Sequence, residues 1–150
     1  MTHAILPAER AHIAALTGRL RAGDAAELQA AGIPPGRALW RSYRASVFSR
    51  VALVDGEIAA AWGMGGSPFG RIGRPWLLTA PPVERAPLAV LRVGRQEVAL
   101  MLAVCPELRG VVDAAYGRAI RFLVALGFGI GPEFPFGPHE APFREYRLSR

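Results

Sequence analysis

The dipeptide Asp55-Gly56 lies between two runs of apolar, β-prone residues, 48–54 and 57–64. An Asp-Gly pair between such runs favours a tight two-residue turn, because both positions of that turn need positive φ angles. The pattern therefore predicts an antiparallel β-hairpin in the middle of the chain. This hairpin restricts the fold to one that contains a sheet.

The segments on either side of the hairpin alternate between helical and strand patterns. Residues 7–31 are expected to be helical with a break at Gly23, Asp24 capping a short second helix through Ala30, and a third helix covers about 36–46. After the hairpin we expect a loop over 65–75, strands at 76–79 and 108–115, helices from about 84 or 86 to 104 and over 117–126, and two last strands, 128–136 and 143–148. This order predicts a single mixed α/β domain over 1–150 with one central sheet.

The composition supports a folded domain. The 150 residues are 51% hydrophobic and 20% charged, which excludes a disordered chain. The longest apolar runs are too short to span a membrane, and the N-terminus lacks the pattern of a secretory signal. We therefore expect a soluble protein of the cytoplasm.

The charge leaves two interpretations open. All 18 basic residues are Arg, and the net charge is +6. This excess is either general solubility charge or a preference for polyanions. The lone Cys105 cannot form an internal disulfide and is predicted to be a small core residue. The three histidines, His3, His12 and His139, lack the spacing of a metal site, so none is predicted.

Residues 112–128 (VDAAYGRAIRFLVALGF) combine a strand, an Ala-containing helix and a Gly-Phe ending. This segment and the element order resemble the GNAT N-acetyltransferases. The resemblance implies a mixed sheet of six to seven strands flanked by helices, acetyl-CoA as cofactor and an amine as acceptor. Residues 53–63, 75–79, 119–128 and 142–144 further resemble GNAT-like proteins of short-tailed phages, related to an internal virion protein. That narrower resemblance implies association with virion proteins in the host cytoplasm.

The chain departs from the GNAT pattern in the loop after the fourth strand, where those enzymes bind the pyrophosphate through backbone amides. Residues 80–89 contain no glycine, and Pro81, Pro82 and Pro87 supply no amide hydrogen. The cofactor loop is therefore degenerate. Tyr116 stands where many GNAT proteins have Asn, and Leu123 stands where a Tyr often protonates the thiolate.

The resemblance implies a set of site residues. A backbone amide near residues 78–80 would polarise the carbonyl, and Glu84 or Asp113 would act as base. Tyr116 would contact the cofactor or act as an acid. The expected cofactor contacts are Leu78, Thr79, Arg85 and Arg118. Each candidate also has a structural interpretation: Glu84 as a first-turn helix acid, Asp113 as a turn cap and Tyr116 as an amphipathic packing residue.

Three functions remain open from the sequence. The first is acetyl transfer from acetyl-CoA to an amine, and the second is a non-catalytic, virion-associated structural or assembly role. The third is a basic nucleic-acid-associated module, for which Arg37, Arg41 and Arg44 form a stripe on one helix; a solvated face explains this stripe equally simply.

Overall fold

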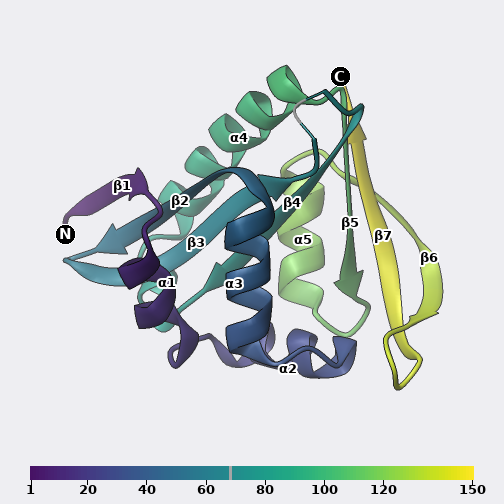
Figure 1. The fold of residues 1–150 in the computed structure, drawn as a ribbon, viewed down its shortest axis with the longest axis horizontal. Helices are drawn as coiled ribbons and strands as arrows, with labels where there is room; N and C mark the ends of the chain where they lie inside the picture. Colours follow the sequence, from purple (N-terminus) through teal and green to yellow (C-terminus); the bar gives the residue numbers. More distant parts are fainter. Residues whose placement is uncertain (68) are drawn as a thin grey trace.

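A computed structural model describes residues 1–67 and 69–150. Seven strands form one mixed sheet in the order β1-β2-β3-β4-β5-β7-β6, with helices on both faces (Figure 1). The elements in chain order are β1 (His3–Pro7), α1 (Arg10–Thr17), α2 (Ala22–Ala31), α3 (Pro35–Ala45), β2 (Ser46–Val54), β3 (Glu57–Gly65), β4 (Ile72–Thr79), η1 (Pro81–Arg85), α4 (Pro87–Val104), β5 (Glu107–Asp113), α5 (Gly117–Ala125), β6 (Gly129–Phe136) and β7 (Ala141–Ser149). The predicted mixed α/β fold with its central sheet is confirmed.

The predicted hairpin is the antiparallel pair β2–β3. Its turn residues Asp55 and Gly56 have φ angles of 51° and 78°, as a tight two-residue hairpin turn requires. Along β3 the side chains alternate between the two faces of the sheet: Ala60 and Trp62 contact one core cluster, and Ala61 contacts the other. Because both faces of this strand are covered, it carries an almost continuous apolar run.

Each face of the sheet has its own layer of helices. On one face, α4 and α5 pack over a cluster that includes Met64, Met101 and Leu108. On the other face, α1 and α3 pack over a cluster that includes Ile13 and Leu39. Helix α2 lies across the end of the sheet at which β4 and β5 terminate (Figure 1). Cys105 is fully buried, as expected of a small core residue.

The two central strands β4 and β5 are parallel but pair only at their beginnings. Ile72 pairs with Glu107 and Gly73 with Leu108, and no further register pair follows. Pro75, two residues on, has no amide hydrogen for a ladder. Its carbonyl instead accepts a 3.1 Å hydrogen bond from the hydroxyl of Tyr146 on β7. From this point the strands separate toward their carboxyl ends (Figure 1).

Several element boundaries differ from the expectations. Strand β1 was not predicted, because its five residues are all exposed and carry no alternation. The predicted loop over 65–75 is wrong where β4 begins, at Ile72; residue 68 of that loop lies outside the described residues. Gly73 and Pro75 look like loop residues, yet they lie in β4, where Gly73 faces the side chain of Met64. The helix expected from about 84 or 86 begins at Pro87, close to the later of these two starts, and a short 3-10 turn precedes it.

Candidate functional site

A cavity of about 1380 Å³ includes the space between the separated strands β4 and β5 and extends beyond it to residues of β1, β2 and α3. Its walls include the first turns of α4, helix α5 and the acidic face of α2. Cavities of this size accommodate extended small-molecule ligands. The cavity lies in the middle of the sheet because two strands that would otherwise pair are held apart.

Strand β4 presents alternate residues to this cleft. The amide of Ala80 donates to Ala59 on the other side, at 2.8 Å, and Leu78 pairs with Ala61 in the same register. By the alternation of an antiparallel ladder, Leu77 and Thr79 therefore direct their backbone groups toward β5. Of the amides expected near residues 78–80, only that of Thr79 faces the cleft. The amide of Leu77, a residue that the sequence did not single out, is the second amide that faces the cleft.

Residues at the start of α2 form hydrogen bonds with both backbone groups of Thr79. The Thr79 amide donates to Asp24 Oδ2 at 2.6 Å, and the Arg21 amide donates to the Thr79 carbonyl at 2.9 Å. The Thr79 hydroxyl also donates to Asp24 and accepts from Arg21 Nε. The prediction that Asp24 caps the second helix is therefore wrong. Asp24 is a buried residue inside α2, and Arg21 is the N-cap.

One turn further along α2, Glu27 binds the opposite strand. Its Oε2 accepts a 3.0 Å hydrogen bond from the amide of Asp113 at the end of β5. Burial raises the pKa of Glu27 to about 7, against the lowering effect of this amide, and the carboxylates of Asp24 and Asp113 add to the rise. A carboxyl group with a pKa near 7 can bind and release a proton at neutral pH.

Tyr116 lies across the mouth of the cleft. Its hydroxyl donates to Asp24 Oδ1 at 2.7 Å, and its ring lies so close to Gly23 that a side chain there would collide with it. Burial raises the pKa of Tyr116 above its ordinary value, and the hydrogen bond to Asp24 raises it further. Tyr116 therefore stays protonated and acts as a hydrogen-bond donor to α2.

The predicted bases are placed differently from one another. Asp113 accepts a hydrogen bond from the amide of Ala115 at 2.9 Å, which is the turn-capping arrangement expected as its structural interpretation. Glu84 lies in η1, with its side chain about half exposed, and pairs with Arg21 at 3.6 Å and Arg118 at 3.2 Å. It links α2, η1 and α5 at the mouth of the cleft. Both of these contacts occupy Oε1 of Glu84.

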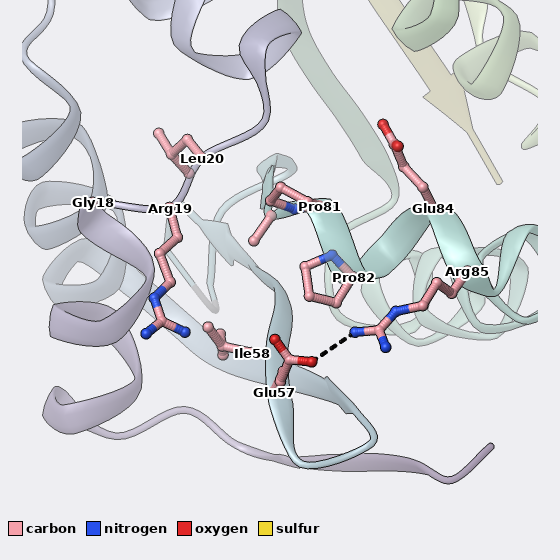
Figure 2. A pocket seen from close by; sticks show the side chains of 10 residues that line it. Gly18, Arg19, Leu20, Glu57, Ile58, Pro81, Pro82, Glu84 and Arg85 are labelled. Carbon is pink, nitrogen blue, oxygen red and sulfur yellow. Dashed lines mark hydrogen bonds and ion pairs between the residues drawn. The ribbon is translucent and has the colours of Figure 1, made fainter.

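Arg85 and Arg118 line different pockets. Arg118 lines the cavity. Arg85 lines a smaller pocket of about 710 Å³ instead, and Figure 2 shows it reaching across that pocket to Glu57, at 2.9 Å. The structure therefore groups Leu78, Thr79, Glu84, Tyr116 and Arg118 around the cavity and leaves Arg85 outside it.

The start of α4 offers two amides despite the prolines. Ala86, its N-cap, provides no side-chain hydrogen bond, and the Val90 amide is the first to bond back, to Ala86. The amides of Leu88 and Ala89 thus have no partner within the helix. Ala89 lines the cavity, and its amide and that of the neighbouring Leu88 could hold an anion together with Arg118. The prolines therefore reduce the number of backbone amide donors at this anion site but do not remove all of them.

The sequence missed Arg21, Asp24 and Glu27 as site residues. A signal for two of them exists: Asp24 and Glu27 are three residues apart on a predicted helix, so they share a face. Which strands that face would meet depends on tertiary structure. Within residues 1–67 and 69–150, no group of three or more metal-ligating side chains occurs, and no helix is long and apolar enough to cross a membrane.

The arginine stripe of α3 is divided: Arg41 lines the cavity, and Arg44 packs elsewhere. Arg44 lies over the ring of Trp40 at 5.8 Å, and Arg10 of α1 lies over the same ring at 5.8 Å. Such stacking is a stabilising cation–π contact. It gives Arg44 a structural role, and a nucleic-acid partner remains a prediction.

The fold is that of the GNAT acetyltransferases. Aminoglycoside acetyltransferase AAC(6')-Ib in complex with coenzyme A superimposes with a TM-score of 0.70 at 16% identity, over 99% of this chain and 95% of that one. A GNAT-family acetyltransferase from Streptococcus pneumoniae gives 0.66 at 14% identity, over 99% of both chains. A putative acetyltransferase from Salmonella typhimurium with its cofactor acetyl-CoA gives 0.65 at 15% identity, over 99% and 94%. No protein-family model and no curated protein sequence matches the chain.

Proposed function

We propose that this protein transfers an acetyl group from acetyl-CoA to an amine. The observation that carries the proposal is the cleft between β4 and β5, which pair only at Ile72 and Gly73 of β4 and then separate within a larger cavity of about 1380 Å³. Structural relatives with this fold include complexes with coenzyme A and acetyl-CoA. The amine class of the acceptor follows from the aminoglycoside ligands of related structures.

The residues around the cavity fit an acyl-CoA. Arg118 and the free amides of Leu88 and Ala89 would hold the phosphates. The backbone of Leu77 would hold the arm and polarise the acetyl carbonyl through its amide. When bound, the cofactor supplies an acetyl group activated as a thioester. The prolines at 81, 82 and 87 reduce the number of amides available, so we expect weaker cofactor binding than a glycine-rich loop gives.

Glu27 is the proton acceptor in this proposal. It lines the cavity between the two separated strands, and its pKa of about 7 suits a group that takes a proton from an ammonium near neutral pH. This assignment replaces Glu84, which is held in two ion pairs, and Asp113, which caps a turn. Leucine at position 123 has no proton to give, so solvent would protonate the leaving thiolate.

A thermal-shift titration tests the proposal. Acetyl-CoA or desulfo-CoA at about 100 times its Kd should stabilise the fold by about 2.7 kcal/mol, or raise the Tm by about 5–10 °C. Arg118→Ala should reduce the shift. Arg85→Ala, the matched control, removes an arginine that lies outside the cavity and should preserve it. No shift of the wild-type Tm at millimolar cofactor would refute acetyl-CoA binding.

The two other functions predicted from the sequence make different demands. A virion-associated role draws no support from the structural relatives, which are acetyltransferases. A nucleic-acid module would require binding that weakens steeply with salt. Both predict an unchanged Tm in the titration above, so a cofactor-dependent shift favours acetyl transfer over either of them.

A further inference from the structure

The docking of α2 removes hydrogen-bonding capacity from the edge of β4. All residues from Gly73 to Thr79 are described, and alternate ones face the cleft. Pro75 has no amide hydrogen and its carbonyl is held by Tyr146. Thr79 has its amide on Asp24 and its carbonyl on Arg21. Leu77 is the residue of this edge whose donor and acceptor both remain available to a ligand.

Release of α2 would double that capacity. Leu77 and Thr79 are two residues apart, so their backbone pairs lie about 6.8 Å apart along the strand edge. The arm of coenzyme A contains two amide groups in series, which can bond to two successive backbone pairs of a strand. With α2 docked, one of these amides has no partner on β4.

Helix α2 is attached in a way that permits release. Asp24 is its one buried residue, whereas α1 buries Ile13 and Leu16 in the core. Besides the contacts with Thr79, the start of α2 is held by the ion pair of Arg21 with Glu84 and by the bond from Tyr116 to Asp24, and one turn further on Glu27 accepts the amide of Asp113. Water can replace polar contacts of this kind, while buried apolar side chains resist exposure.

We propose that α2 is an autoinhibitory element: Arg21 and Asp24 compete with the arm of an acyl-CoA for the backbone of Thr79. Full engagement of the cofactor then requires Arg21 and Asp24, at the start of α2, to leave the β4 edge, while Glu27, one turn further on, keeps its bond to the amide of Asp113. The inference rests on the proposed function, since it concerns the same ligand in the same cleft. It predicts that the wild-type protein binds coenzyme A more weakly than variants with a weakened α2 contact.

Calorimetric titration with two ligands tests the competition. Coenzyme A carries the arm, and adenosine 3',5'-bisphosphate resembles its nucleotide end without the arm. Asp24→Ala removes the carboxylate from Thr79, and should tighten coenzyme A binding about tenfold while leaving the nucleotide affinity unchanged. Thr79→Val removes the hydroxyl contacts to Arg21 and Asp24 and keeps a β-prone side chain, so it should act in the same direction if Asp24→Ala folds poorly. Glu133→Gln, on the exposed part of β6, is the charge-matched control.

The outcomes separate the two proposals. Tighter binding of coenzyme A alone, in either variant, supports competition by α2. If both variants bind coenzyme A with the affinity of the wild type or more weakly, the inference is overturned and the proposed function stands. An equal gain for both ligands would show a general charge effect, and would also overturn it. If neither the wild type nor any variant binds coenzyme A, the proposed function fails and the inference fails with it.

Discussion

Glu97 and Glu27 both line the central cleft, and the fold surrounds their carboxylates in opposite ways. Glu97 on α4 is 6% exposed, receives hydrogen bonds from Arg50 and from the indole of Trp62, each at 2.9 Å, and so has its charge balanced by a guanidinium. Glu27 on α2 receives the amide of Asp113, and its nearest charged neighbours are the carboxylates Asp24 and Asp113.

The difference distinguishes a structural acid from the proposed proton acceptor. A buried carboxylate that pairs with a cation and a hydrogen-bond donor fixes the elements it joins, here α4 to β2 and β3. A carboxylate left without a cation takes up protons more readily, and this tendency costs stability above its unfolded pKa. Strongly perturbed groups in a cleft are candidates for chemistry. Four predictions test this contrast, in order of expected effect.

The largest effect is expected on turnover. Glu27→Gln keeps an oxygen to accept the Asp113 amide but cannot take a proton, so kcat for acetyl transfer should fall by about 100-fold or more. Glu84→Gln should leave kcat within a few-fold of the wild type. Steady-state release of free thiol from acetyl-CoA measures both. Comparable losses in the two variants would move the proton acceptor away from Glu27.

Loss of the paired acid should instead reduce stability. Glu97→Ala leaves the indole of Trp62 and the guanidinium of Arg50 without their acceptor, and should lower the free energy of unfolding by about 2–3 kcal/mol. Denaturant titration measures this change. Turnover per folded molecule should be preserved, and a selective loss of turnover would show that Glu97 also takes part in the reaction.

The pH dependence of stability should follow Glu27. Its pKa is about 7 in the fold and 4.5 in the unfolded chain, so the folded state binds the extra proton. The stabilisation is therefore complete below pH 4.5 and is lost as the pH rises through about 7, by about 3 kcal/mol in total. The carboxylates of Asp24 and Asp113 raise the pKa of Glu27. The charge of Glu27 in turn raises the pKa of Tyr146, after burial, which is the larger cause.

Unfolding curves at pH 5 and pH 8 check this dependence. Glu27→Gln should be more stable than the wild type at pH 8 and should flatten the profile between the two values. Glu133→Gln should leave the profile as it is. A wild-type profile that is already flat over this range would contradict the assignment.

The smallest effect should come from removing the cation. Arg50→Leu leaves Glu97 with the indole alone and should cost about 1 kcal/mol at pH 7, a modest loss because the Arg50 side chain is 39% exposed. The cost of Arg50→Leu should shrink in a Glu97→Gln background, where the charged partner is absent. Equal costs in both backgrounds would show that Arg50 stabilises the sheet through packing over Phe48 rather than through Glu97.

The sequence predicted the fold more fully than the site. Periodicity locates α4, β5 and α5 to within a few residues, since long amphipathic patterns and a Gly-terminated helix are local signals. The hairpin at Asp55-Gly56 is equally local. Strand β1 escaped because all its residues are exposed, and the start of β4 escaped because Gly73 and Pro75 imitate a loop.

The site depends on contacts that no local signal contains. Thr79 and Tyr116 were singled out by resemblance, and the structure places them together through Asp24. Asp24 lies 55 residues from Thr79 and 92 from Tyr116 along the chain. Glu27 owes its reactivity to desolvation, which depends on how α2 closes the end of the sheet. Only the tertiary structure reveals that.

The pairing of Pro75 with Tyr146 bears on what happens when the cleft is empty. Two parallel strands with unpaired edges tend to form backbone hydrogen bonds successively along their length. After Gly73, the next bond would need an amide hydrogen that Pro75 lacks, and the carbonyl of Pro75 already accepts from the Tyr146 hydroxyl. The gap therefore stays open at its narrow end without any ligand to hold the strands apart.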